Sequence, residues 1–231
     1  MIESEVRENL LRVTSALPEG VTLCAVSKYH SQEEILCAYH QGQRIFAENH
    51  VQEMVLKHKE LPQDIQWHMI GHLQTNKVRQ IAPFVSLIQS VDSMHLLEEI
   101  NLQAQKAGRV IPVLLEIHLG QEESKTGLSF KECLELLNDP RTALLTGIRI
   151  EGVMGMASHT DDRSQIASEF RLLKAFFIFI QTTYAFSYPF LKTLSMGMSG
   201  DYDLAVESGS NMVRVGTGIF GERAALAPSN E

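Results

Sequence analysis

The feature that most constrains the fold of this 231-residue chain is a series of short apolar segments that alternate with stretches of helical periodicity. We predict eight strands, at residues 21–28, 44–49, 65–71, 85–92, 111–119, 148–156, 191–196 and 212–215. Helical spacing of apolar residues occupies residues 3–17 and most of the intervals between the strands. This alternation, without a low-complexity linker, predicts an α/β protein with a single (β/α)8 barrel domain over residues 1–231. A doubly wound open sheet is the alternative, because one wrongly assigned strand would prevent closure.

Polar residues at fixed spacing mark where several helices begin. Ser31 and Glu34, and likewise Ser129 and Glu132, have the spacing of a capping box. Asp162 precedes a long helix that continues to about residue 180. These signals place the helices directly after the predicted strands.

Composition excludes several functional classes. Lys and Arg total 20 against 28 for Asp and Glu, a formal charge of -8, which argues against a nucleic-acid partner held through phosphates. Cys24, Cys37 and Cys133 lack metal-ligand spacing, so we expect reduced thiols in the cytosol. The N-terminus MIESEVRENL is no signal peptide, and the apolar cluster at 176–180 is far shorter than the ~20 residues that span a bilayer. We therefore expect a soluble, cytoplasmic protein.

The first predicted strand ends in a lysine, Lys28. Functional residues of a barrel lie at the C-terminal ends of its strands. A partly desolvated primary amine in that place can form a Schiff base with an aldehyde or ketone. The ordinary alternative is a solvated lysine at a strand end.

Polar residues and one glycine also lie near the ends of the next three strands. They are Glu48, Asn49, His68, Gly71 and Ser90. Asn49, three residues before Gln52, can equally be a helix cap. His68 can equally be a packed histidine, and no metal site is predicted because no second ligand has the right spacing.

The last two strands run into segments rich in small residues, 195–199 and 215–218. Backbone N–H groups and hydroxyls in such segments suit a phosphate. Arg214 lies between Val213 and Val215, so it faces the opposite side of the strand, and in a barrel interior its charge must meet an acceptor. A ring nitrogen or a carboxylate would serve. An amine, phosphate loops and this arginine together suggest pyridoxal 5'-phosphate (PLP).

Seven sequence blocks extend this interpretation over nearly the whole chain. They are AVSK (25–28), EN (48–49), WHMIGHLQTNK (67–77), SVD (90–92), ESKTG (123–127), SMGMSGD (195–201) and VRVGTGIFG (213–221). With them the sequence resembles the pyridoxal phosphate homeostasis protein family, single-domain relatives of the barrel half of alanine racemase, of PLP fold type III. Two departures from the family pattern are Ala47, where a glycine is expected, and the segment 155–162. The second is expected to alter the rim of the pocket.

The resemblance implies a role for individual residues of this chain. Lys28 would carry PLP as a Schiff base, and Arg214 would face the pyridine nitrogen. Ser195, Ser199, Gly216 and Thr217 would lie at the phosphate. Asn49, His68, Ser90 and Met196 would line the pocket.

The resemblance further implies a protein that binds PLP and keeps vitamin B6 and amino-acid pools in balance, without established turnover. Only ten residues follow Gly221, so we expect no C-terminal β domain of the kind that completes the racemase. We therefore expect a monomeric regulator or carrier that hands PLP to apo-enzymes. One alternative is a slow PLP-dependent racemase that uses Lys28 with His68 or Tyr202 as base. The other is a PLP-free Schiff-base aldolase, which Arg214 and the phosphate-type loops disfavour.

Overall fold

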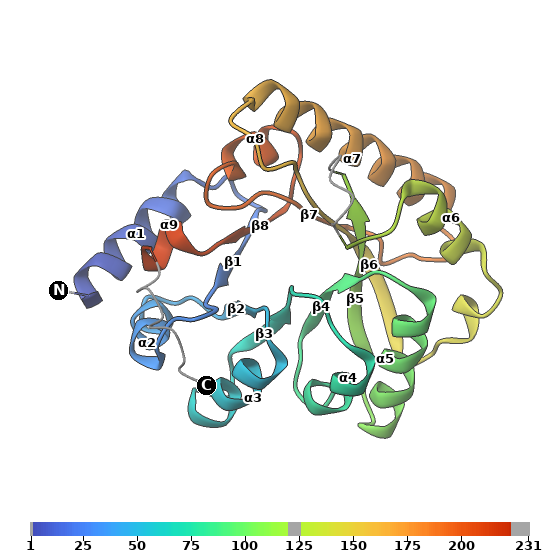
Figure 1. Ribbon diagram of the computed structural model, residues 1–231, viewed down its shortest axis with the longest axis horizontal. Coiled ribbons are helices and arrows are strands. Elements are labelled where there is room, and N and C mark those ends of the chain that lie inside the picture. The colour runs from blue at the N-terminus through green and yellow to red at the C-terminus, as the bar shows by residue number, and fades with distance from the viewer. Residues whose placement is uncertain (1, 120–125, 223–231) are drawn as a thin grey trace, which may run out of the picture.

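The computed structural model describes residues 2–119 and 126–222, and its centre is a closed barrel of parallel strands. Each strand pairs with the next along the chain, and β8 pairs with β1 (Figure 1). This closure confirms the predicted barrel and excludes the open sheet. The strands are β1 (Thr22–Val26), β2 (Ile45–Glu48), β3 (Gln66–Met69), β4 (Leu87–Val91), β5 (Ile111–His118), β6 (Ile148–Met156), β7 (Thr193–Ser195) and β8 (Met212–Val215).

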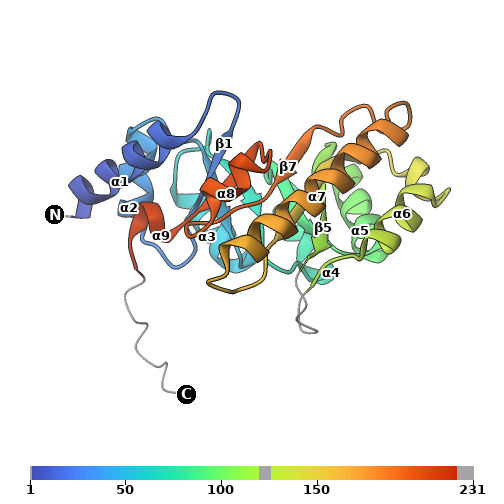
Figure 2. The ribbon, with the colours of Figure 1, turned by 90° about the horizontal axis from the view of Figure 1, so that it is seen from above.

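Helices lie around the ring of strands (Figures 1 and 2). They are α1 (Ile2–Ala16), α2 (Gln32–His40), α3 (Val51–Glu60), α4 (Thr75–Ile81), α5 (Met94–Lys106), α6 (Phe130–Asn138), the short 3-10 helix η1 (Thr142–Leu144), α7 (Arg163–Thr183), α8 (Tyr202–Glu207) and α9 (Thr217–Phe220). α1 packs beside α9, where Asn9 Nδ2 donates a 3.2 Å hydrogen bond to Ile219 O. Among the described residues, no helix has the length and hydropathy required to cross a membrane.

Two kinds of buried cluster follow from the alternation of side chains along each strand. The main core lies between strands and helices and includes Trp67 and Phe46. Smaller clusters fill the barrel itself: Leu87, Leu114, Met154 and Met212 form one, and Cys24, Val26 and Ala47 form the other. The interior is thus filled with side chains, as this fold requires.

The helix starts follow the predicted capping signals, with one exception. Ser31 and Glu34 form a complete capping box at α2, Ser129 and Glu132 form another at α6, and Asp162 caps α7. The predicted cap at Asn49 is wrong, because α3 begins after His50, whose side chain makes no capping bond. The predicted loop 120–127 lies mostly outside the described residues.

Candidate functional site

The side chains that face the barrel interior form regular rows. Cys24 and Val26 of β1 belong to an interior cluster. Lys28, two residues further on, lies in the turn that follows β1 at the C-terminal end of the barrel, so the predicted strand 21–28 extends two residues too far. Lys28 is half-buried there, just past the last residue of β1.

The backbone on both sides of this position is constrained. Tyr29 has a φ of 66°, in the left-handed region that is costly for a residue with a side chain. On the neighbouring strand, the chain at Gly216 comes so close to β1 that an added Cβ would lie 3.2 Å from Val26 O. The segment that follows β8 is thereby brought beside the end of β1.

Arg214 points into the barrel, as its position between two valines predicted, and is only 3% exposed. Nη1 donates to Ser195 Oγ at 2.7 Å, and Nη2 donates to Gly155 O at 3.0 Å. Both of these acceptors are neutral. Burial lowers the pKa of the guanidinium, while acidic groups nearby, Asp201 and Glu116 among them, oppose that shift.

A chain of hydrogen bonds continues from Arg214 through the interior. Ser195 Oγ donates to Gln89 Oε1 at 2.7 Å, and Gln89 Nε2 lies 3.0 Å from His68 Nδ1. Burial lowers the pKa of His68 to about 3, so its ring is neutral near pH 7 and Nδ1 can accept this bond. Cys24 Sγ lies 3.7 Å from the same nitrogen. The hydrogen bonds therefore all run in one direction, from Arg214 through Ser195 and Gln89 to His68.

The loops after β7 and β8 meet at a serine hydroxyl. Ser199 Oγ accepts hydrogen bonds from the backbone N–H groups of Gly216 and Gly218, both at 3.2 Å. Thr217, between them, is exposed and begins α9. Two backbone N–H groups thus converge where these loops meet, and backbone N–H groups gathered in this way are the donors that phosphate sites use.

The ends of β2, β3 and β4 are joined in a similar way. Ser90 Oγ donates to Gly71 O at 2.6 Å. Gly71 in turn lies so close to Asn49 that an added Cβ would be 2.7 Å from the Asn49 Cα. Asn49 also borders a cavity of about 260 Å³ that His72 and Lys77 help to line.

Two of the predicted site residues lie apart from these loops. Ser195 is fully buried in the barrel, where it bonds Gln89 and Arg214. Met196, the next residue, faces the other way and belongs to the main core between strands and helices. Of the two departures from the family pattern, Ala47 lies in the interior cluster, and the segment 155–162 supplies the Gly155 carbonyl to Arg214.

Sequence reasoning missed two buried polar residues beside the site, Gln89 and Lys57. Gln89 interrupts the apolar run of β4, which signals a buried side chain that needs partners. Lys57 follows Glu53 by four residues on α3, the spacing of a helical ion pair. Lys57 also bonds Glu48, the residue at the end of β2, at 2.9 Å.

Comparison with known proteins identifies the family. A profile described as alanine racemase, N-terminal domain, matches residues 3–224. A pyridoxal phosphate homeostasis protein of Vibrio alginolyticus is 34% identical over 235 residues, covering 95% of this chain and 98% of the relative. The chain belongs to the pyridoxal phosphate homeostasis protein family. This membership confirms the resemblance drawn from the sequence blocks.

Solved structures of the same kind share the barrel. PipY of Synechococcus elongatus PCC7942, in a structure without PLP, has a TM-score of 0.86 and 36% identity, covering 94% of this chain and 100% of PipY. The structure of PipY with PLP bound has a TM-score of 0.84 and 35% identity over the same shares of the two chains. An alanine racemase of Bartonella henselae, 19% identical with a TM-score of 0.69, shares the fold, and 59% of its length is covered.

Proposed function

We propose that this chain binds PLP as a Schiff base on Lys28 and acts in vitamin B6 and amino-acid homeostasis. The observation that carries the proposal is the arrangement of three neighbouring strands. Lys28 lies in the turn at the end of β1, Arg214 of the neighbouring β8 is buried in the barrel interior, and two backbone N–H groups after β8 donate to Ser199 in the loop after β7. The structure of the related PipY with PLP bound supports PLP as the ligand.

In this proposal, different residues of the chain contact different parts of PLP. Ser199, Gly216 and Thr217 hold the phosphate, and Arg214 faces the ring nitrogen. Asn49, His68 and Ser90 line the pocket. Ser195 orients Arg214, because its hydroxyl accepts the 2.7 Å hydrogen bond from Arg214 Nη1.

PLP supplies an electron-accepting ring when bound. An arginine beside the ring nitrogen does not give up its proton, so it leaves the ring unprotonated and a weaker electron acceptor. This pairing favours a protein that holds PLP over one that turns over amino acids. We accordingly propose a carrier or regulator, monomeric in solution, that delivers PLP to apo-enzymes.

The racemase alternative requires a base near Lys28. His68 is unsuited to that role, because its pKa of about 3 and its bond to Gln89 leave it a weak base near pH 7. Tyr202, the other candidate, begins α8 and is half-buried. Racemisation assays with the wild type and Lys28→Ala separate the two functions, and Lys28-dependent turnover would overturn the carrier proposal.

The binding proposal is tested by absorbance with added PLP, before and after borohydride, followed by mass spectrometry of the peptide that contains Lys28. We expect a visible band that reduction removes and a pyridoxyl mass on Lys28. Lys28→Ala should lose both, while Lys59→Ala, on the exposed side of α3, should keep both. A protein that stays colourless, or a normal band in Lys28→Ala, would contradict the proposal.

A further inference from the structure

Three charged residues form a buried cluster behind the end of β1. Lys57 is 6% exposed and Glu48 is 0% exposed, and the partly exposed Glu53 completes the cluster. Lys57 Nζ lies 2.9 Å from Glu48 Oε1, 2.7 Å from Glu53 Oε1 and 2.7 Å from the backbone oxygen of Ser27. These contacts use all three donors of the ammonium group.

The cluster contacts both neighbours of Lys28. On one side, Ser27 donates from its hydroxyl to Glu48 Oε1 at 2.6 Å, and its carbonyl accepts the bond from Lys57. On the other side, the Tyr29 N–H donates to Glu53 Oε1 at 2.6 Å. The residue between them, Lys28, is therefore held through the backbone on both sides.

The hold on Tyr29 has an energetic consequence. A non-glycine residue at φ 66° costs on the order of 1–2 kcal/mol, and such strain persists only where the surroundings enforce it. The bond from its N–H to Glu53 supplies that restraint, and a 2.8 Å contact between the Tyr29 hydroxyl and His50 Nε2 adds a second one. The turn after Lys28 is thus fixed from α3.

Stability alone is a poor explanation for this cluster. Buried charges lose hydration, and apolar residues of the same volume often stabilise a fold as well or better. Burial raises the pKa of the Glu48 carboxyl to about 7 against the opposing effect of Lys57. Glu48 Oε2 moreover has no hydrogen-bond partner among the described residues. Because the burial of these charges costs free energy, we look for the role of the cluster in positioning the residues that it contacts.

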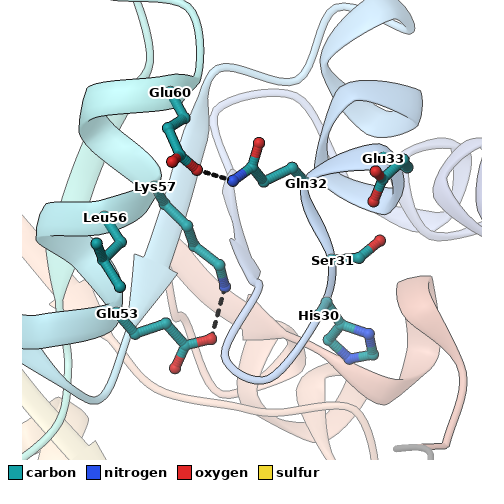
Figure 3. Close-up of a pocket in the computed structure, with 8 residues that line it drawn as sticks. All are labelled: His30, Ser31, Gln32, Glu33, Glu53, Leu56, Lys57 and Glu60. Atoms are coloured by element: carbon teal, nitrogen blue, oxygen red, sulfur yellow. Dashed lines mark hydrogen bonds and ion pairs between the residues drawn. The ribbon is translucent and has the colours of Figure 1, made fainter.

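The cluster is also reached from solvent on its outer side. Lys57 and Glu53 line a cavity of about 460 Å³ between α2 and α3, together with residues such as His30 and Leu56. Figure 3 shows Lys57 and Glu53 turned toward one another, and Gln32 bonded to Glu60 across the cavity. α3 therefore contacts the segment that carries Lys28 from outside the barrel.

We infer that Lys57 is a positioning residue for Lys28: with Glu48 and Glu53 it fixes the peptides on either side of Lys28 and so directs the amine into the mouth of the barrel. The expected effect on PLP binding rests on the proposed function. The expected effect on the backbone around Lys28, measured by hydrogen exchange, is independent of PLP.

The experiment uses the double variant Glu48→Gln with Lys57→Met, which removes both buried charges together. Lys59→Met, an exposed lysine of the same helix, is the matched control. Two quantities are measured on protein that circular dichroism shows to be folded. They are hydrogen exchange of the peptide 26–30 without PLP, and the PLP concentration that half-saturates the borohydride-trapped product on Lys28.

We expect faster exchange at the Tyr29 amide in the double variant and about tenfold weaker formation of the Lys28 product, since small displacements of a reacting group have effects of this order or larger. The Lys59→Met control should match the wild type in both. Equal exchange and equal half-saturation in the double variant and the control would overturn the inference.

Two further outcomes are decided in advance. If the double variant does not fold, Glu53→Ala, at a partly exposed position, removes the acceptor of the Tyr29 N–H and must speed exchange there for the inference to stand. If the wild type forms no product on Lys28, the proposed function fails. Unchanged exchange at Tyr29 would then still overturn the positioning role, and faster exchange would support it.

Discussion

Arg214 Nη1 donates a 2.7 Å hydrogen bond to Ser195 Oγ, and the two residues lie on neighbouring strands in the barrel interior. The hydroxyl has a single proton, which it donates to Gln89 Oε1 at 2.7 Å. Ser195 therefore joins the charged Arg214 to the neutral residues Gln89 and His68 in the chain of hydrogen bonds inside the barrel. The direction of every bond in the chain depends on this hydroxyl.

Ser195→Ala should loosen Arg214 and leave Gln89 Oε1 without its donor. We expect a loss of about 1–3 kcal/mol in the free energy of unfolding, the cost of an unsatisfied buried polar group. In the proposed function the same change weakens the binding of PLP and of pyridoxal equally, because Arg214 faces the ring that both ligands share. Denaturant unfolding and absorbance titrations with both ligands measure these effects. Ser208→Ala, at the end of α8, is the control, and a variant as stable as that control would contradict the assignment.

The neutral state of His68 predicts a pH dependence of stability. Its pKa is lowered to about 3 by burial, below the value of about 6.5 in an unfolded chain. The unfolded state therefore binds a proton first, and stability falls as the pH drops from 6.5 toward 3. His68→Gln removes this titration, so its difference in unfolding free energy from the wild type should shrink on acidification. A difference that stays constant between pH 7 and pH 4 would be inconsistent with a buried neutral ring.

Glu48 predicts a dependence of the opposite sign. Burial raises its pKa to about 7, above the unfolded value of about 4.3. The folded state therefore binds the proton first, and the stability that Glu48 contributes in acid is lost as the pH rises through 7. Between pH 5 and pH 8 the wild type should lose more unfolding free energy than Glu48→Gln. Equal losses, measured by denaturant unfolding at both pH values, would show that Glu48 titrates normally.

The strand order and the inward direction of Arg214 could be predicted because each depends on local sequence. Apolar runs identify strands, and the alternation of side chains orients a residue that lies between two valines. The capping boxes at Ser31 and Ser129 were predictable for the same reason.

The partners of buried polar groups could not be predicted in this way. Ser195 contacts Gln89, a residue more than one hundred positions away along the chain, and this pair forms only when the barrel closes. Lys57 showed a local signal, its spacing from Glu53, but its bonds to Ser27 and Glu48 join a helix to the ends of two strands. Asn49 fitted two local roles, a helix cap and a ligand contact, and the structure places the N-cap of α3 one residue later, at His50.

The close approach of β2 and β3 at their ends makes Gly71 intolerant of a side chain. An added Cβ would lie 2.7 Å from the Asn49 Cα, and backbone atoms cannot move aside as a flexible side chain can. Gly71→Ala should cost about 1–3 kcal/mol of unfolding free energy, the range for overpacking. Gly200→Ala is the control, since nothing lies within 4 Å of its added Cβ. Similar unfolding midpoints for the two variants would contradict this reading of the strand ends.

Ser199 supplies the sharpest test of the phosphate assignment. Its hydroxyl accepts the N–H bonds of Gly216 and Gly218, so Ser199→Ala removes an oxygen from the place where the loops after β7 and β8 meet. The proposed function places the phosphate there, so the variant should weaken the binding of PLP by about 1.5–3 kcal/mol, the range for a hydrogen bond to a charged group. Pyridoxal, which lacks the phosphate, should bind the variant and the wild type equally. Ser195→Ala is the matched comparison, because it should weaken the binding of both ligands alike. If Ser199→Ala keeps the wild-type preference for PLP over pyridoxal, the phosphate lies elsewhere in the barrel.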